Sequence, residues 1–126
     1  IQTARRVNDG KSRWVIEQVQ ARAAALEDQL GRSARIGCLG LAFKPDVDDL
    51  RESPALHITT ELLVAGLEVL ACEPNLHEHS TIKLHTLEQV VADADLLVFL
   101  VAHTPFRHLN LAGRNVFDLC GVTEQA

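Results

Sequence analysis

The chain contains 126 residues, of which 17 are Asp or Glu and 12 are Lys or Arg, so its formal net charge is −5 with His neutral. Hydrophobic residues make up 47% of the chain and charged residues 23%, which is typical of one globular domain and excludes a disordered or low-complexity chain. The negative charge, without any block of basic residues, argues against nucleic acid and anionic membranes as partners.

Two further features bear on where the protein is found and how much of it this sequence represents. Its longest apolar run, around residues 96–102, is far shorter than the about 20 residues that a membrane-spanning helix requires, and no signal segment opens the chain. We therefore expect a cytoplasmic protein that does not enter a membrane. The chain contains no Met and begins with Ile1, so we also expect it to be a piece of a longer protein.

Residues 12–30 are predicted to form a helix, because apolar residues recur there at spacings of three and four. These residues are Ile16, Val19, Ala23, Leu26 and Leu30. Gly31 follows at the position where a helix commonly ends with a positive φ. The plausible boundary lies at residues 31–34, so we divide the sequence into residues 1–32 and residues 33–126.

Strands and helices alternate after this boundary. Nearly continuous apolar runs predict strands over residues 34–42, 67–72, 96–101 and 115–119. Ser53-Pro54 predicts a helix over residues 54–65, and a capping box from Thr86 to Gln89 predicts a third helix. This alternation indicates a parallel sheet with helices on both faces, which is a Rossmann-like, three-layer α/β fold.

Ligands of open parallel sheets bind beyond the carboxyl ends of the strands, where loops and helix N-termini gather. The loop over residues 44–52 carries most of the chemical information at this edge, although it contains neither a G-x-G-x-x-G fingerprint nor a Walker A sequence. Lys44 supplies a positive charge for a phosphate beside the predicted helix N-terminus at Pro54. The alternative is that Lys44 and Arg51 only neutralise acidic residues of a solvent-exposed loop.

Other polar residues at this edge carry weaker signals. Glu73 follows a predicted strand, at the place where nucleotide-binding sheets often hold a ribose. His103 follows another strand and is expected either to contact a nucleotide or to help start a short helix. His77 and His79 lack the further ligands of a known metal site, so we expect no metal. All three cysteines lie in or beside predicted strands, which favours a structural role.

The loop that follows the first strand resembles a known family. The runs over residues 40–46 (GLAFKPD) and 49–55 (DLRESPA) are similar to the signature of the C-terminal, UDP-binding domain of the UDP-glucose/GDP-mannose dehydrogenase family. Within that family, residues 4–11, 73–75 and 100–106 are most similar to the UDP-N-acetyl-D-mannosamine dehydrogenases. The resemblance covers nearly the whole chain.

The resemblance implies a nucleotide-sugar-binding domain of an NAD-dependent enzyme that oxidises the C6 alcohol of a UDP-sugar to a carboxylate. The reaction takes two hydride transfers and passes through an intermediate held by a cysteine. By position, Phe43 and Lys44 resemble residues that line the UDP-sugar site, and Arg51 resembles one that reaches toward NAD bound by an N-terminal domain. The motif of the cysteine nucleophile and the dinucleotide fingerprint are absent from this sequence, so we expect no catalytic residue in it and no activity from it alone.

The resemblance also implies that residues 1–32 are the end of a long helix that connects the two domains and forms a homodimer interface. The apolar stripe of this helix would then meet the N-terminal domain or a second subunit. A break is expected at Gly10, because Gly in a helix costs about 1 kcal/mol relative to Ala. One departure from the family is Cys120, which replaces the usual Lys or Arg two residues after Asp118 and removes a ligand contact.

A second hypothesis, from a different functional class, is a flavodoxin-like protein-interaction module without catalytic activity. Its interaction surface would be the acidic strand ends and the first helix. Binding of UDP at Phe43, Lys44 and Arg51 distinguishes the two hypotheses.

Overall fold

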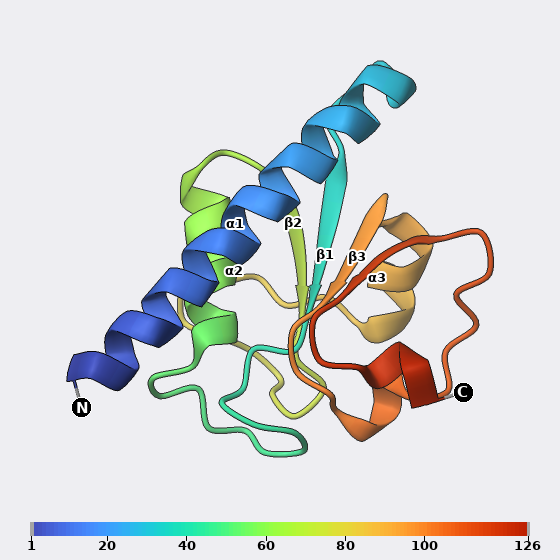
Figure 1. The fold of residues 1–126 in the computed structure, drawn as a ribbon. Helices are drawn as coiled ribbons and strands as arrows, with labels where there is room; N and C mark the ends of the chain where they lie inside the picture. The colour runs from blue at the N-terminus through green and yellow to red at the C-terminus, as the bar shows by residue number, and fades with distance from the viewer. Residues whose placement is uncertain (1, 126) are drawn as a thin grey trace.

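A computed structural model of the protein describes residues 2–125 and the side chains of residues 11–123. Its elements are the helix α1 (Gln2–Leu30), the strand β1 (Arg35–Leu39), α2 (Pro54–Val64), β2 (Glu68–Cys72), α3 (Leu87–Asp93), β3 (Leu96–Phe99), the 3₁₀ helix η1 (Thr104–Phe106), β4 (Asn115–Asp118) and the 3₁₀ helix η2 (Val122–Gln125). The strands form one parallel, four-stranded sheet in the order β2-β1-β3-β4 (Figure 1).

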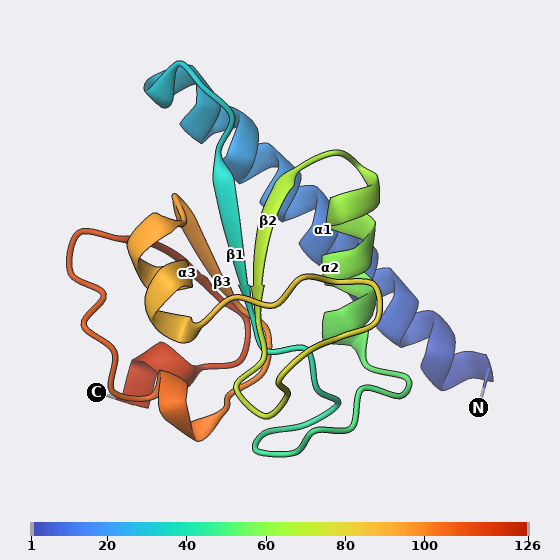
Figure 2. The same ribbon diagram turned by 180° about the vertical axis from the view of Figure 1, so that it is seen from behind.

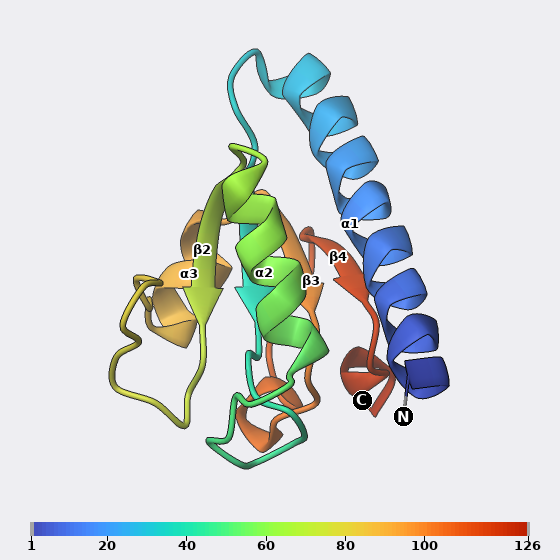
Figure 3. The ribbon, with the colours of Figure 1, turned by 90° about the vertical axis from the view of Figure 1, so that its left-hand side faces the viewer.

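Helices cover both faces of this sheet, so the predicted three-layer α/β fold is confirmed. One face packs against α1 and α2, and the other face packs against α3 and the two 3₁₀ helices. Figure 3 shows the sheet between α3 and the pair formed by α1 and α2, and Figure 2 shows the α3 face turned toward the viewer. Side chains that alternate along each strand therefore enter two separate hydrophobic cores.

The first helix ends as predicted but begins earlier and is continuous. It ends at Leu30, and Gly31 follows with a φ of +70°. The expected break at Gly10 is wrong, because the helix runs through this residue. Helix propagation is cooperative, so one Gly that costs about 1 kcal/mol does not end a helix that continues on both sides.

The apolar stripe of α1 has its partner within this chain. Val19 and Ala23 are buried in the core formed with the sheet and α2, and Ile16 and Leu26 pack against the same core. The expectation that this stripe meets another domain or subunit is therefore wrong for these residues, because the chain's own sheet covers them. Leu30, at the end of the stripe, is exposed.

Three of the four strands, β1, β3 and β4, end earlier than predicted, whereas β2 ends at Cys72 as predicted. The first ends at Leu39 because Gly40 turns with a φ of +99°, and its N–H donates to the carbonyl of Cys72 (2.9 Å). The third ends at Phe99, after which the N–H of Leu100 donates to the carbonyl of Leu39 (2.9 Å). The residues released from the ladder form the edge where the loops gather.

Among residues 2–125, no helix has the length and hydropathy of a membrane span.

Candidate functional site

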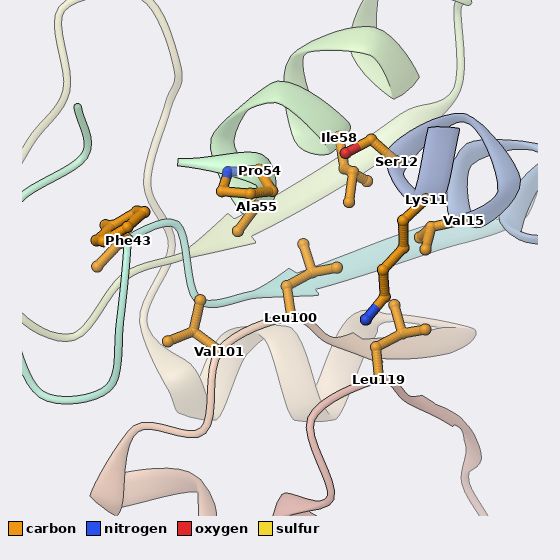
Figure 4. A pocket seen from close by; sticks show the side chains of 11 residues that line it. Lys11, Ser12, Val15, Phe43, Pro54, Ala55, Ile58, Leu100, Val101 and Leu119 are labelled. Carbon is orange, nitrogen blue, oxygen red and sulfur yellow. The ribbon is translucent and has the colours of Figure 1, made fainter. Parts of the chain in front are cut away.

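A cavity of about 230 Å³ opens at the carboxyl edge of the sheet, between α1, the start of α2 and the ends of β1 and β3 (Figure 4). Most of the described side chains that line it are apolar, and Lys11 is the only charged one among these. The lining residues are Lys11, Ser12, Val15, Ala42, Phe43, Pro54, Ala55, Ile58, Leu100, Val101 and Leu119. The cavity therefore lies where the topology of an open parallel sheet places a ligand.

Gly40 brings the end of β1 against the end of β3 at this cavity. A Cβ at residue 40 would lie 2.7 Å from the Cβ of Val101 and 3.0 Å from its backbone nitrogen. The φ of +99° is also one that side chains with a Cβ rarely adopt. Only glycine therefore lets the chain turn here and deliver Leu41 and Ala42 to the cavity.

Ser53 fixes the start of α2 beside the cavity, as its sequence position predicts. Its Oγ accepts the N–H of Leu56 (3.2 Å) and donates to the carbonyl of Leu41 (2.7 Å). Pro54 occupies the first helical turn, where its missing N–H is harmless. The positive end of the α2 dipole consequently faces the cavity through Pro54 and Ala55.

Of the two predicted site residues in the loop after β1, Phe43 lines the cavity and Lys44 does not. The N–H of Phe43 donates to the carbonyl of Asp49 (2.8 Å), and its ring is 53% exposed at one end of the cavity. Lys44 is exposed, does not line the cavity, and has no ion-pair or hydrogen-bond partner among the side chains that the structure describes. Lys44 is thus a free cation of this loop, next in sequence to Phe43, which lines the cavity.

Arg51 is not brought to the cavity. Its guanidinium donates to both carboxylate oxygens of Asp49 (2.9 and 3.1 Å), and its side chain is 88% exposed. These hydrogen bonds from Arg51 lower the pKa of Asp49 to about 2. In this structure Arg51 therefore neutralises Asp49 in an exposed loop, which is the alternative given above for this residue.

Among the described side chains, the cation that lines the cavity is Lys11 of α1, which entered the sequence analysis only as part of the resemblance over residues 4–11. Figure 4 shows its amine extending from α1 toward Leu119, across the cavity from Phe43. A signal for it existed in the sequence, because Lys11 lies four and eight residues before Val15 and Val19 and so on the buried face of the helix.

Glu73 and His103 form a buried pair beneath the loop, so the weak signal for a ribose contact at Glu73 is not supported. Oε1 of Glu73 accepts hydrogen bonds from the N–H groups of Leu41 (2.9 Å) and Ala42 (3.0 Å) and from Nε2 of His103 (2.8 Å). Oε2 accepts from the backbone and side-chain nitrogens of Asn75 (2.9 and 3.2 Å). Both side chains of the pair are fully buried, so neither is available to a nucleotide. His103 does precede η1, but its side chain does not cap this helix.

Asp118 binds the turn that follows β4. Its Oδ1 accepts the N–H groups of Cys120 (3.1 Å) and Gly121 (2.9 Å), and its Oδ2 accepts the N–H of Thr123 (2.8 Å). Oδ2 also accepts the hydroxyl of Thr123. Burial opposes ionisation of Asp118, but the hydrogen bonds from the Thr123 hydroxyl and from these N–H groups outweigh it and lower the pKa of this carboxyl. Cys120 is half-buried in the same turn and is not one of the residues that line the cavity, although Leu119 before it is.

The cysteines lie in environments that disfavour a thiolate. Burial raises the pKa of Cys38 and of Cys72 to about 12, and burial beside Asp118 raises the pKa of Cys120 to about 11. Because the thiolate is the nucleophilic form, these thiols are unreactive near neutral pH. This environment supports the structural role expected of all three.

Comparisons with known proteins agree with this geometry. Residues 37–125 match the UDP-glucose/GDP-mannose dehydrogenase family, UDP binding domain. The UDP-N-acetyl-D-mannosamine dehydrogenase of Escherichia coli (strain K12) is 45% identical over 126 residues, covering 92% of this chain and 29% of that protein. The NDP-N-acetyl-D-galactosaminuronic acid dehydrogenase of Ralstonia solanacearum is 36% identical over 130 residues, covering 97% of this chain and 30% of that protein.

The fold of the chain is also similar to solved structures of related enzymes. A solved structure of the UDP-N-acetyl-mannosamine dehydrogenase Cap5O from S. aureus superposes with a TM-score of 0.81 at 28% identity, covering 99% of this chain and 30% of that one. The chain spans 29–30% of the length of these relatives. It belongs to the UDP-glucose/GDP-mannose dehydrogenase family and contains that family's UDP binding domain.

Proposed function

We propose that the cavity beside α1 and α2 binds the UDP part of a UDP-sugar, and that the chain is the UDP-binding part of an NAD-dependent UDP-sugar 6-dehydrogenase. The names of its relatives favour UDP-N-acetyl-D-mannosamine as the sugar nucleotide. The observation that carries the proposal is the position of the cavity, at the carboxyl edge of the parallel sheet and at the N-terminus of α2. Family membership argues against the flavodoxin-like interaction module.

The chemistry of the cavity suits a nucleoside diphosphate. Its apolar walls and the exposed ring of Phe43 offer contact for a flat uracil, since aromatic side chains stack on bases. The α2 dipole and two free cations, Lys11 in the lining and Lys44 beside it, offer compensation for the diphosphate. This division of apolar and cationic groups supports UDP over an uncharged ligand.

The oxidation itself is assigned to parts of the enzyme outside this sequence. The relatives are more than three times as long as the chain, and the thiols described here have pKa values too high for a nucleophile at neutral pH. In the whole enzyme, two molecules of NAD⁺ would each accept one hydride from C6 of the sugar. Of this chain's residues, we propose that Arg51 reaches toward NAD and that α1 contributes to a homodimer, and we expect the isolated chain to be inactive.

Titration of the chain with UDP tests the proposal. We expect saturable binding by calorimetry, with amide chemical-shift changes concentrated at Phe43, Lys44 and Ala55. Uridine should bind more weakly, because it lacks the diphosphate. No binding of UDP even at millimolar concentration would refute the proposal.

Alanine variants of the two lysines identify the diphosphate contact. A charge-assisted hydrogen bond contributes about 1.5–3 kcal/mol, so losing one should weaken UDP binding roughly 10- to 100-fold. We expect Lys11→Ala and Lys44→Ala to weaken binding while the thermal midpoint stays unchanged, because neither lysine has a partner among the described side chains. Lys83→Ala, which removes an exposed lysine outside the cavity lining, is the matched control.

A further inference from the structure

The segment formed by Phe43, Lys44 and Pro45 is held between two backbone anchors. At its start, the N–H of Ala42 donates to Oε1 of Glu73 (3.0 Å). At its end, the N–H of Asp46 donates to Nδ1 of His103 (2.8 Å). The two anchors are themselves connected, because Nε2 of His103 lies 2.8 Å from the same Oε1 of Glu73. One buried pair therefore holds both ends of the three-residue segment.

The hydrogen bonds determine the protonation of this pair. Nδ1 of His103 accepts the N–H of Asp46, so the ring proton lies on Nε2 and is donated to Glu73. Burial opposes ionisation of Glu73, but hydrogen bonds from His103, Asn75 and Leu41 outweigh it and lower the pKa of this carboxyl. The pair is consequently a neutral imidazole beside a carboxylate whose two oxygens both have donors.

A buried polar pair of this kind is not needed to fill a core. Well-packed apolar residues of similar volume are often as stabilising as a buried pair, or more so. Here Glu73 follows β2, His103 follows β3, and the N–H groups of Leu41, Ala42 and Asp46 that they bind follow β1. The pair therefore connects the carboxyl ends of three strands beneath the loop.

The backbone at Asp46 shows that the anchor constrains the loop. Its φ is +61°, a left-handed conformation that is uncommon for residues other than glycine. Such a conformation persists when surrounding contacts determine it. The backbone N–H of Asp46 donates to His103, and the Asp46 carboxylate accepts hydrogen bonds from the N–H (2.8 Å) and the hydroxyl (2.7 Å) of Thr104. Three hydrogen bonds between Asp46 and residues 103 and 104 thus attach the loop to the segment that follows β3.

We propose that His103 and Glu73 are positioning residues that hold Phe43 and Lys44 at the mouth of the cavity before UDP binds. The inference rests on the proposed function, because it gives the segment its ligand. Neither residue touches the ligand itself, since both are buried under the loop. The pair lowers the cost of binding because the loop is already ordered.

Two variants of His103 separate its two hydrogen bonds. The side-chain oxygen of Asn occupies about the place of Nδ1, so His103→Asn keeps an acceptor for the N–H of Asp46. The side-chain amide of Gln reaches about the place of Nε2, so His103→Gln keeps a donor to Glu73 and leaves the N–H of Asp46 without an acceptor. His108→Gln, at an exposed histidine, is the control for the substitution itself.

We expect His103→Gln to speed amide hydrogen exchange at Asp46 in the absence of UDP and to weaken UDP binding about tenfold, as the loss of a buried hydrogen bond implies. His103→Asn should restore both quantities to within about threefold of the unmodified chain. A purely structural role would instead make both variants lose thermal stability with no difference between them at Asp46.

Measurements on the unmodified chain do not depend on whether the variants fold. The imidazole nitrogens of His103 should show the Nε2–H tautomer by NMR, and the Asp46 amide should exchange more slowly than the Lys44 amide. The opposite tautomer, or equal exchange at these two amides, would overturn the inference. Equal UDP affinity of His103→Gln and the unmodified chain would overturn the positioning role alone. Absence of UDP binding by the unmodified chain would overturn the proposed function, and the inference with it.

Discussion

Replacing Gly40 with Ala tests whether the close approach of β1 and β3 forms the edge of the cavity. The substitution adds a Cβ 2.7 Å from the Cβ of Val101 and places it on a backbone with a φ of +99°. Two effects therefore act together, steric overlap and backbone strain. Two other glycines of the chain separate them.

Gly66 isolates the strain, because its φ is +91° and no atom lies within 4 Å of an added Cβ. Gly66→Ala should cost about 1–2 kcal/mol of unfolding free energy. Gly37 isolates the overlap, because its φ is not positive but an added Cβ would lie 2.6 Å from Cγ1 of Val90 and 3.1 Å from Cβ of Ala94. Gly37→Ala should cost about 1–3 kcal/mol, the usual range for an overpacked core. The sum predicts a loss of about 2–5 kcal/mol for Gly40→Ala.

Urea denaturation followed by circular dichroism measures all three losses on one scale, provided the slope with urea stays constant across the variants. We expect Gly40→Ala to be the least stable and also to lose affinity for UDP, because the displaced strand end carries Ala42 to the cavity. A Gly40→Ala variant that is no less stable than Gly66→Ala would refute the conclusion that contact with Val101 demands glycine at this position.

Three further predictions use other contacts. Ser53→Ala should lower the unfolding free energy by about 1–2 kcal/mol, because the start of α2 loses its cap. A change in unfolding free energy of less than about 0.3 kcal/mol would contradict the capping role. The three cysteines should resist iodoacetamide near pH 8 in the folded chain and react in urea, since burial raises each thiol pKa; rapid labelling of the folded chain is the contrary result. Glu73 and Asp118 have lowered pKa values when folded, so their ionisation stabilises the fold above the unfolded value of about 4. The urea midpoint should therefore fall as the pH drops through the folded-state pKa values of these two carboxyls, and it should fall less steeply in Asp118→Asn. A urea midpoint that does not depend on pH would contradict this stabilising role of the two carboxylates.

Local signals in the sequence were sufficient to predict the three α-helices and the four strands among residues 2–125, though not all of their ends. Gly31 ends the first helix, Ser53-Pro54 begins the second, and the capping box from Thr86 to Gln89 begins the third. Each signal consists of a side chain acting on backbone groups within a few residues of itself, so no knowledge of the rest of the chain is required. The apolar strands between these helices then leave a parallel, three-layer fold as the arrangement that buries them on both faces.

The site depended on contacts that only the folded chain brings together. His103 meets Glu73 across 30 residues and Asp46 across 57 residues of sequence, and no local pattern pairs them. Likewise, the motif pointed to Lys44, whereas the crossing of α1 over the sheet places Lys11 in the cavity. Periodicity determines which face of a helix or strand is buried, but the partner of a polar side chain depends on how whole elements pack against each other. That packing is a property of the tertiary structure, because side chains from several distant segments must fit one another at once.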